Sequence, residues 1–188
     1  HNTTVHRMVA RVGMERVTEG TLRLGPALPG GRRPAILGPE DSDAVARFWR
    51  GSPVLAAMGG LYSRDWTWRE LSAAALAAML ERGEVVAERA PDGSLAAVAT
   101  IHHWPGDEEM WVGIADGEPA AVQSLALAIR AGAAGAGADN AQILLPRVPW
   151  LREAFLAAGY EPDDWDDELW VYELRLEQDE AGEGERGH

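Results

Sequence analysis

The most informative segment of this sequence is Leu151-Arg152-Glu153-Ala154-Phe155-Leu156-Ala157-Ala158-Gly159-Tyr160. Its apolar residues recur at the spacing of one helix face, and Gly159 is a typical helix stop. The stretch 169–176 alternates in the manner of a strand and ends Leu-Arg-Leu. The segment therefore predicts an amphipathic helix closed by glycine and followed by strands.

The same pattern occurs near the start of the chain, as Val5-His6-Arg7-Met8-Val9-Ala10-Arg11-Val12-Gly13-Met14. An apolar helical stripe again ends at a glycine, and an extended stretch again closes with Leu-Arg-Leu, at Leu22–Leu24. The two glycines are about one domain length apart, so an internal repeat is the interpretation we favour. Such units are common in proteins, and a coincidental match stays open.

Between the two units the pattern predicts alternating helices and strands. A Pro- and Gly-rich stretch at 26–34 is the best linker, and Pro91-Asp92-Gly93 indicates a hairpin turn. Thr67-Trp68-Arg69-Glu70 resembles a capping box that opens a helix reaching about Gly83. We predict strands at 35–37, 85–89, 95–102, 109–115, 141–145 and 169–176, and helices at 39–49, 67–83, 118–135 and 149–158. This order predicts an α/β (α+β) fold, a mixed sheet with helices on both faces.

The helix–glycine–strand unit resembles the closing segment of the GNAT superfamily of acyl-CoA-dependent N-acetyltransferases. That segment has the form Asn-x-x-(Ala/Val)-x-x-(Leu/Met)-Tyr-x-x-(apolar)-Gly-(Phe/Tyr/Met), followed by two antiparallel strands. The first unit fits it at Asn2, Val5, Met8, Val12, Gly13 and Met14, and the second at Leu151, Phe155, Ala158, Gly159 and Tyr160. The element order from 34 to 176 is also similar to that family.

The resemblance divides the chain into four parts. Residues 1–25 are expected to be the C-terminal remnant of a preceding GNAT-like domain, residues 26–34 a linker, residues 35–176 a GNAT-like domain, and residues 177–188 an acidic disordered tail. Because segment 1–25 has apolar faces that need a partner, we predict that it packs on the main domain or on a second chain. The interpretation is a tandem GNAT protein seen as its C-terminal part.

The resemblance also implies acetyl-CoA or another acyl-CoA as co-substrate, with its diphosphate at the start of the helix after the fourth strand. The equivalent positions here, together with the place of the family's tyrosine, are Ile114, Ala120, Ala121, Val122, Gln123, Ser124 and Phe155. The family's Arg/Gln-x-x-Gly-x-Gly/Ala pattern is missing. Asp116 and Glu118 bring negative charge to the expected diphosphate position, and Pro119 removes an amide donor.

The expected catalytic groups are also incomplete. Many family members use the tyrosine as a proton donor, but Val9 holds its place in the first unit and Phe155 in the second. A base on the fourth strand would be Glu108 or Glu109, although exposed charges beside a turn are the more ordinary interpretation. His102 and His103 are read in the same way, as structural or exposed. No third ligand has the spacing of a metal site, so we expect no metal.

Eight tryptophans are many for 188 residues. Trp66 and Trp68 precede the second predicted helix, a region that shapes the acceptor pocket in the family, although tryptophans more often fill cores. With the acidic stretch 163–168 and a net charge of −13, they suggest a small amine or cationic acceptor. The same charge argues against nucleic acid and anionic membrane as partners.

The remaining composition is that of an ordinary globular protein, with 46% apolar and 25% charged residues. The absence of cysteine excludes disulfides and fits the cytoplasm, and no segment has the apolar length of a membrane span. The expected function is acyl transfer from acyl-CoA to an amine, in a domain that looks catalytically degenerate. The alternatives are a non-catalytic GNAT-fold interaction or dimerisation module, for example in a homodimer, and an unrelated α/β domain.

Overall fold

The computed structural model describes residues 8–162 and 168–173. Its central sheet has eight strands, in the order β10-β1-β8-β7-β6-β5-β2, with β9 paired to β1. The strands are β1 (Glu15–Pro26), β2 (Ala35–Ile36), β5 (Val85–Arg89), β6 (Leu95–His102), β7 (Glu109–Gly117), β8 (Asn140–Pro146), β9 (Glu161–Pro162) and β10 (Glu168–Glu173). Among the described strands only β7 and β8 are parallel neighbours, so the sheet is mixed as predicted.

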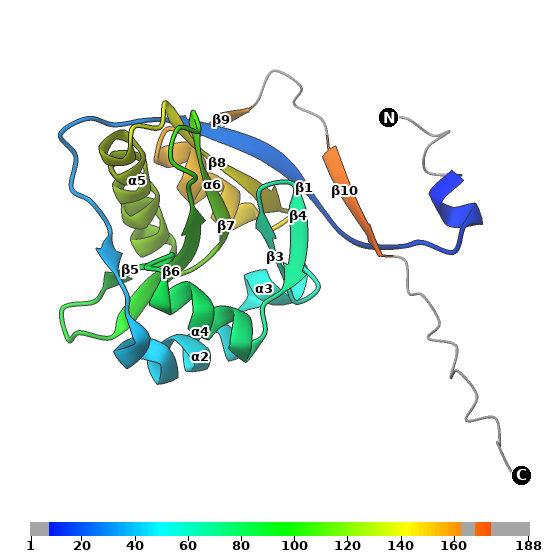
Figure 1. The fold of residues 1–188 in the computed structure, drawn as a ribbon, viewed down its shortest axis with the longest axis horizontal. Coiled ribbons are helices and arrows are strands. Elements are labelled where there is room, and N and C mark those ends of the chain that lie inside the picture. Colours follow the sequence, from blue (N-terminus) through cyan, green and yellow to red (C-terminus); the bar gives the residue numbers. More distant parts are fainter. Residues whose placement is uncertain (1–7, 163–167, 174–188) are drawn as a thin grey trace, which may run out of the picture.

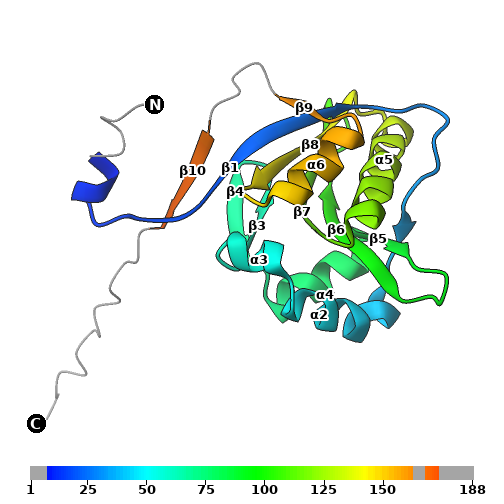
Figure 2. The same ribbon diagram turned by 180° about the vertical axis from the view of Figure 1, so that it is seen from behind.

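Helices cover both faces of this sheet (Figures 1 and 2). On one face α5 (Pro119–Ala136) packs across β5 to β8 with α6 (Pro149–Ala157) beside it. On the other, α2 (Ser42–Arg50) packs on α4 (Ala73–Glu81) and β6, next to the short helices η1 (Pro39–Asp41) and α3 (Pro53–Ala57). The buried stripe of α5 is made of alanines and of Val122, Leu125 and Ile129, the periodicity that the sequence showed.

The structure corrects the prediction for residues 51–72. Thr67–Glu70 is not a helix start but strand β4, which pairs with β3 (Leu61–Arg64) as a separate hairpin over β7. Helix α4 begins later, at Ala73, because the Ser72 side chain accepts the Ala75 N–H at 3.2 Å and caps it. The stretch 51–60, for which the sequence predicted no helix or strand, contains α3. Tertiary pairing across the hairpin therefore outweighs the local capping pattern.

The N-terminal unit is part of the main sheet. Strand β1 lies between β8, which it pairs with over 20–26, and β10, which it pairs with over 15–21. The prediction that this segment packs on the main domain is thus confirmed for residues 15–25. In Figure 1 the first half of β1 leaves the body of the domain together with β10. Pro26, the first residue of the expected linker, belongs to β1, and the Ala27 and Leu28 amides donate to Asp139 O and Arg130 O.

The two helix–glycine–strand units share their backbone geometry. Gly13 and Gly159 have φ angles of 78° and 79°, the left-handed conformation that ends a helix. A short helix at 8–11 precedes the first glycine and α6 precedes the second. The strands that follow, β1 and β9, pair with each other. The remainder of the first unit at 1–7, the acidic stretch 163–167 and the tail from 174 lie outside the described residues.

Candidate functional site

The parallel strands β7 and β8 separate halfway along their length. They pair with each other only from Glu109 to Val112 against Asn140 to Ile143. Beyond that point they diverge, and among the described strands β7 continues to Gly117 paired with β6 alone while β8 continues to Pro146 paired with β1 alone. At the same point the register between β6 and β7 shifts by a bulge, which leaves Gly113 as the extra residue. The separation divides β7 into two ends, each of which borders its own cavity.

Gly113 is fixed where the β3–β4 hairpin crosses β7. Its carbonyl accepts the Ser63 hydroxyl at 3.1 Å, and the Trp111 indole N–H donates to the same hydroxyl at 2.8 Å. A Cβ at Gly113 would meet the Ser63 carbonyl and, at 2.6 Å, the Thr100 hydroxyl. Only glycine therefore fits at this crossing.

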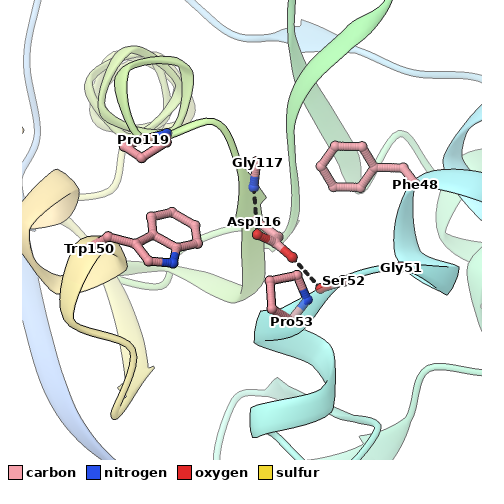
Figure 3. Close-up of a pocket in the computed structure, with 8 residues that line it drawn as sticks. All are labelled: Phe48, Gly51, Ser52, Pro53, Asp116, Gly117, Pro119 and Trp150. Atoms are coloured by element: carbon pink, nitrogen blue, oxygen red, sulfur yellow. Dashed lines mark hydrogen bonds between the residues drawn. The ribbon is translucent and has the colours of Figure 1, made fainter.

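The first cavity lies at the C-terminal end of β7, against the start of α5. We call it the α5 slot. Its volume is about 380 Å³, and its walls, drawn in Figure 3, are Phe48, Gly51, Ser52, Pro53, Asp116, Gly117, Pro119 and Trp150. Most of these side chains are apolar. The carboxylate of Asp116 is the one charged group among them.

Asp116 is buried, with 4% of its surface exposed, and its oxygens are engaged. One oxygen accepts the Ser52 hydroxyl and the Val54 N–H at 3.5 Å, and the other accepts the Gly117 N–H at 2.7 Å (Figure 3). Ser52 in turn caps α3, since its hydroxyl accepts the Leu55 N–H at 2.9 Å. The carboxylate thereby ties the end of β7 to the start of α3.

The residues expected to hold the cofactor do not form the walls of the α5 slot. Ala120 and Ser124 are exposed, Ala121 and Gln123 are half-buried, and Ile114 and Val122 are in the core. The slot is instead bordered by their neighbours Asp116, Gly117 and Pro119.

Phe155, at the place of the family's proton donor, is fully buried, and its ring meets that of Tyr160 edge-on at 4.8 Å. The Tyr160 hydroxyl donates to Ala126 O at 3.4 Å inside the core, and burial raises the pKa of that hydroxyl.

The second cavity, which we call the tryptophan pocket, lies at the N-terminal end of β7. Its volume is about 510 Å³. Its lining consists of three tryptophans, four carboxylates, a glycine and a glutamine: Asp65, Trp66, Trp104, Gly106, Asp107, Glu108, Glu109, Trp111 and Gln142. Three residues singled out in the sequence, Trp66, Glu108 and Glu109, meet here.

Trp68, the fourth candidate, is elsewhere: it is half-buried and packs against the core from β4. The pocket also contains residues that the sequence reasoning missed. Trp104 and Trp111 lie on either side of the connection between β6 and β7, and this hairpin pairs His102 with Trp111. Pro105-Gly106-Asp107, a turn-forming sequence between the two predicted strands, is the signal that could have found them. Asp65 was missed because 67–70 was read as a helix start.

An ion network lies behind the tryptophan pocket. Glu84 accepts the Arg64 guanidinium at 3.1 Å, the Arg82 guanidinium at 2.6 Å and a His102 ring nitrogen at 3.1 Å. Burial acts to raise the pKa of Glu84, but the hydrogen bonds from Arg82 and His102 and the nearby Arg64 charge outweigh it, so the pKa is lowered. Glu84 is therefore ionised at neutral pH and holds His102, whose ring contacts Trp104 of the pocket.

Two classes of site are not found in the described part of the chain. No group of three or more His, Cys, Asp or Glu residues there is arranged to hold a metal ion. None of the described helices has the length and apolar character needed to cross a membrane.

Comparison with known proteins identifies the fold. No protein-family model and no curated protein sequence matches the chain. Among solved structures it is similar to a GNAT-family acetyltransferase from Colwellia psychrerythraea, with a TM-score of 0.55 and 12% sequence identity. The match covers 85% of this chain and 56% of that one, so the chain spans little more than half of its structural relative. The chain thus has a GNAT-like fold, a mixed α/β sheet with helices on both faces.

Proposed function

We propose that the described domain is a non-catalytic, binding member of the GNAT-fold acyltransferases, in which the seat of the acyl-CoA diphosphate is closed. The proposal rests on one observation: the buried carboxylate of Asp116 lies in the wall of the α5 slot, where the fold would receive the diphosphate.

The charge of Asp116 opposes an anion in this slot. Two unit charges 4 Å apart repel by about 4 kcal/mol in an environment with an effective dielectric constant near 20. The carboxylate also accepts hydrogen bonds from the Val54 and Gly117 amides, so it already uses these two donors beside the slot. Glu118 is the N-cap of α5, and Pro119 removes one more donor at its first turn. The α5 N-terminus thus offers a diphosphate fewer backbone N–H donors and a more negative surrounding than an ordinary helix start does.

In the described part of the chain, the position of the family's tyrosine also provides no proton donor for a leaving thiolate. Phe155 has no ionisable group, and Tyr160 next to it is enclosed in the core with its pKa raised by burial. A general acid must reach the leaving group within hydrogen-bond distance, and a sealed hydroxyl does not.

A second candidate is the active acyltransferase, which moves an acetyl or other acyl group from acyl-CoA to an amine. The separation of β7 from β8 after Val112, with the bulge at Gly113, favours it, because these strands leave an opening in the middle of the sheet. Direct transfer in such an opening would depend mainly on positioning and on polarisation of the thioester. The closed diphosphate seat is the argument against it.

The repeated unit supports a further part of the proposal, a tandem arrangement in which residues 1–25 end a preceding GNAT-like domain. The supports are the shared glycine conformation at 13 and 159 and the pairing of β1 with β9. The full-length gene tests this point. An upstream stretch with no GNAT-like element order would contradict it.

Acetyl-CoA binding tests the main proposal. A ligand at a concentration 100 times its Kd stabilises the folded state by about 2.7 kcal/mol, which shifts Tm by several degrees. We expect no shift for the wild type in 1 mM acetyl-CoA and a measurable shift for Asp116→Asn, which keeps the shape and removes the charge. Trp150→Ala, which widens the same slot, is the control and should gain nothing. A wild-type shift of several degrees with thiol release on adding amines would establish the acyltransferase instead.

A further inference from the structure

We propose that the tryptophan pocket is a binding site for an alkylated ammonium group, that is, an organic cation whose charge is spread over methyl or methylene groups. This inference goes beyond the proposed function and does not depend on it, because the pocket lies at the other end of β7 from the α5 slot. Eight residue steps of strand separate Glu109 from Gly117, which corresponds to roughly 25 Å.

The first argument is the exposure of the indole rings. Trp66 is 59% exposed and Trp104 is 53% exposed, and both border the same cavity. Large aromatic side chains are ordinarily buried, and two exposed ones around one cavity mark a binding surface rather than a core. Trp111 is only 3% exposed and forms a fixed base, since its N–H is held by Ser63.

The second argument is the arrangement of the rings. The Trp66 and Trp111 rings lie 5.2 Å apart with 66° between their planes, so they form an aromatic corner. Trp104 closes another side of the cavity, and the Arg64 guanidinium already lies over its ring, 6.0 Å from the centroid. A cation over the face of a tryptophan is attracted by the ring quadrupole, and cages of aromatic rings bind quaternary ammonium groups in this way.

The third argument is charge. The pocket is lined by the carboxylates of Asp65, Asp107, Glu108 and Glu109 and, in the described part of the chain, by no arginine or lysine. Glu109 is held by the Gln142 amide, which donates to it. Carboxylates beside indole faces favour a cationic ligand and disfavour an anionic one. The four carboxylates alone would not identify the class of ligand, but together with the aromatic corner they indicate an organic cation.

A buried polar group also points at this wall. His102 is nine-tenths buried, and its ring meets Trp104 edge-on at 4.8 Å. Its Nδ1 faces Glu84, while its Nε2 has no hydrogen-bond partner in the described residues and lies 4.0 Å from the Asp65 carboxylate. The wall of the pocket thus contains a ring nitrogen whose hydrogen-bonding capacity the described residues do not satisfy.

The backbone holds the pocket in this form. Asp65 has a φ of 53°. Within the residues that the structure describes, every other residue with a positive φ is a glycine. This conformation makes the tight turn from β3 to β4, whose next residue is Trp66. Strained backbone at a binding surface is a common way to preorganise a side chain. Aspartate tolerates the conformation better than most residues do, so Asp65 serves both the turn and the charge.

The experiment uses the whole protein and a matched pair of probes, choline and its neutral isostere 3,3-dimethyl-1-butanol. Two-dimensional NMR of the indole N–H groups follows the binding. We expect choline to shift the signals of Trp66 and Trp104 in a saturable manner, and the isostere to bind at least about fivefold more weakly, because it lacks the charge that the rings and carboxylates attract.

Two variants and one control locate the site. Trp66→Ala, and separately Asp65→Asn with Glu108→Gln, should each weaken choline binding about fivefold or more. The charge variants keep all three indoles and therefore test the pocket even if the tryptophan variant misfolds. Trp150→Ala in the α5 slot is the control and should leave choline binding unchanged. Equal binding of both probes, no saturable shift, or full binding by both variants would overturn the proposal. None of these outcomes bears on acetyl-CoA, which is tested separately.

Discussion

Both ends of β7 place a carboxylate beside a tryptophan, but the carboxylate is buried at one end and exposed at the other. At the C-terminal end Asp116 is buried and accepts hydrogen bonds from Ser52, Val54 and Gly117. At the N-terminal end Asp107 and Glu108 are exposed. The ring of Trp150 is half-buried at the first end, whereas the Trp66 ring at the second is mostly exposed.

This difference separates a structural role from a binding role. A carboxylate whose lone pairs are taken by the fold stabilises the fold and blocks the slot that it borders. A carboxylate that faces an open aromatic cavity has its charge available for a ligand. The GNAT-like fold leads one to look for function at the start of α5, but the available groups lie at the other end of the same strand.

The largest expected effect comes from removing the buried carboxylate. Asp116→Ala leaves the Ser52 hydroxyl and the Val54 and Gly117 amides without their acceptor, and we expect a loss of about 3 kcal/mol in the free energy of unfolding. Glu108→Ala, the matched change at the other end of β7, should alter that free energy by less than about 0.5 kcal/mol. Urea denaturation measures both values. If the two variants proved equally stable, the distinction between the two ends would be wrong.

A smaller effect is expected at the point that divides the two ends. Gly113→Ala would place a Cβ against the Ser63 carbonyl and the Thr100 hydroxyl, so the β3–β4 hairpin must move away from β7. Overpacking of this kind costs about 2 kcal/mol. Because the hairpin carries Asp65 and Trp66, choline binding should weaken as well. Thermal unfolding and the choline titration are the measurements, and a variant unchanged in both would mean that the hairpin is not fixed by this contact.

The sequence predicted the periodic part of this fold well. Helices α5 and α6, the β5–β6 hairpin at Pro91-Asp92-Gly93 and the left-handed glycines could be read because apolar period and turn chemistry act locally. The β3–β4 hairpin was misread, since Thr67-Trp68-Arg69-Glu70 satisfies a capping pattern that pairing with 61–64 overrides. The place of β1 between β8 and β10 depends on contacts across most of the chain, and no local pattern states it.

The site could be predicted only in part, for the same reason. Trp66, Glu108 and Glu109 were chosen as separate candidates, and the structure brings them into one pocket with Trp104 and Trp111. The negative charge of Asp116 was visible in the sequence. Its burial and its partner Ser52, more than sixty residues away in the chain, were not. Residue type is local information, whereas the state of a carboxylate is set by tertiary neighbours.

The ion network behind the tryptophan pocket gives a pH test of intermediate size. The pKa of Glu84 is lowered in the folded protein, so its contribution to stability is complete above the unfolded value of about 4.3 and is lost as the pH falls through the lower folded pKa. We expect wild type to be more stable than Glu84→Gln at pH 7, and the difference to shrink below about pH 4. Thermal unfolding from pH 3 to pH 7 measures this. A constant difference would show that Glu84 is not ionised in this network.

The smallest expected effect on stability is also the sharpest test of the comparison. Trp66→Ala removes a ring that is 59% exposed, and surface changes of this kind alter the free energy of unfolding by about 0.5 kcal/mol or less. Truncating a buried tryptophan that supports the fold lowers the free energy of unfolding much more, by about 3–5 kcal/mol. Urea denaturation of Trp66→Ala, with Trp111→Ala as the buried counterpart in the same pocket, decides the point. Near-wild-type stability joined to lost choline binding means that the fold keeps Trp66 exposed for a ligand, whereas a large loss of stability would make it a core residue of the hairpin.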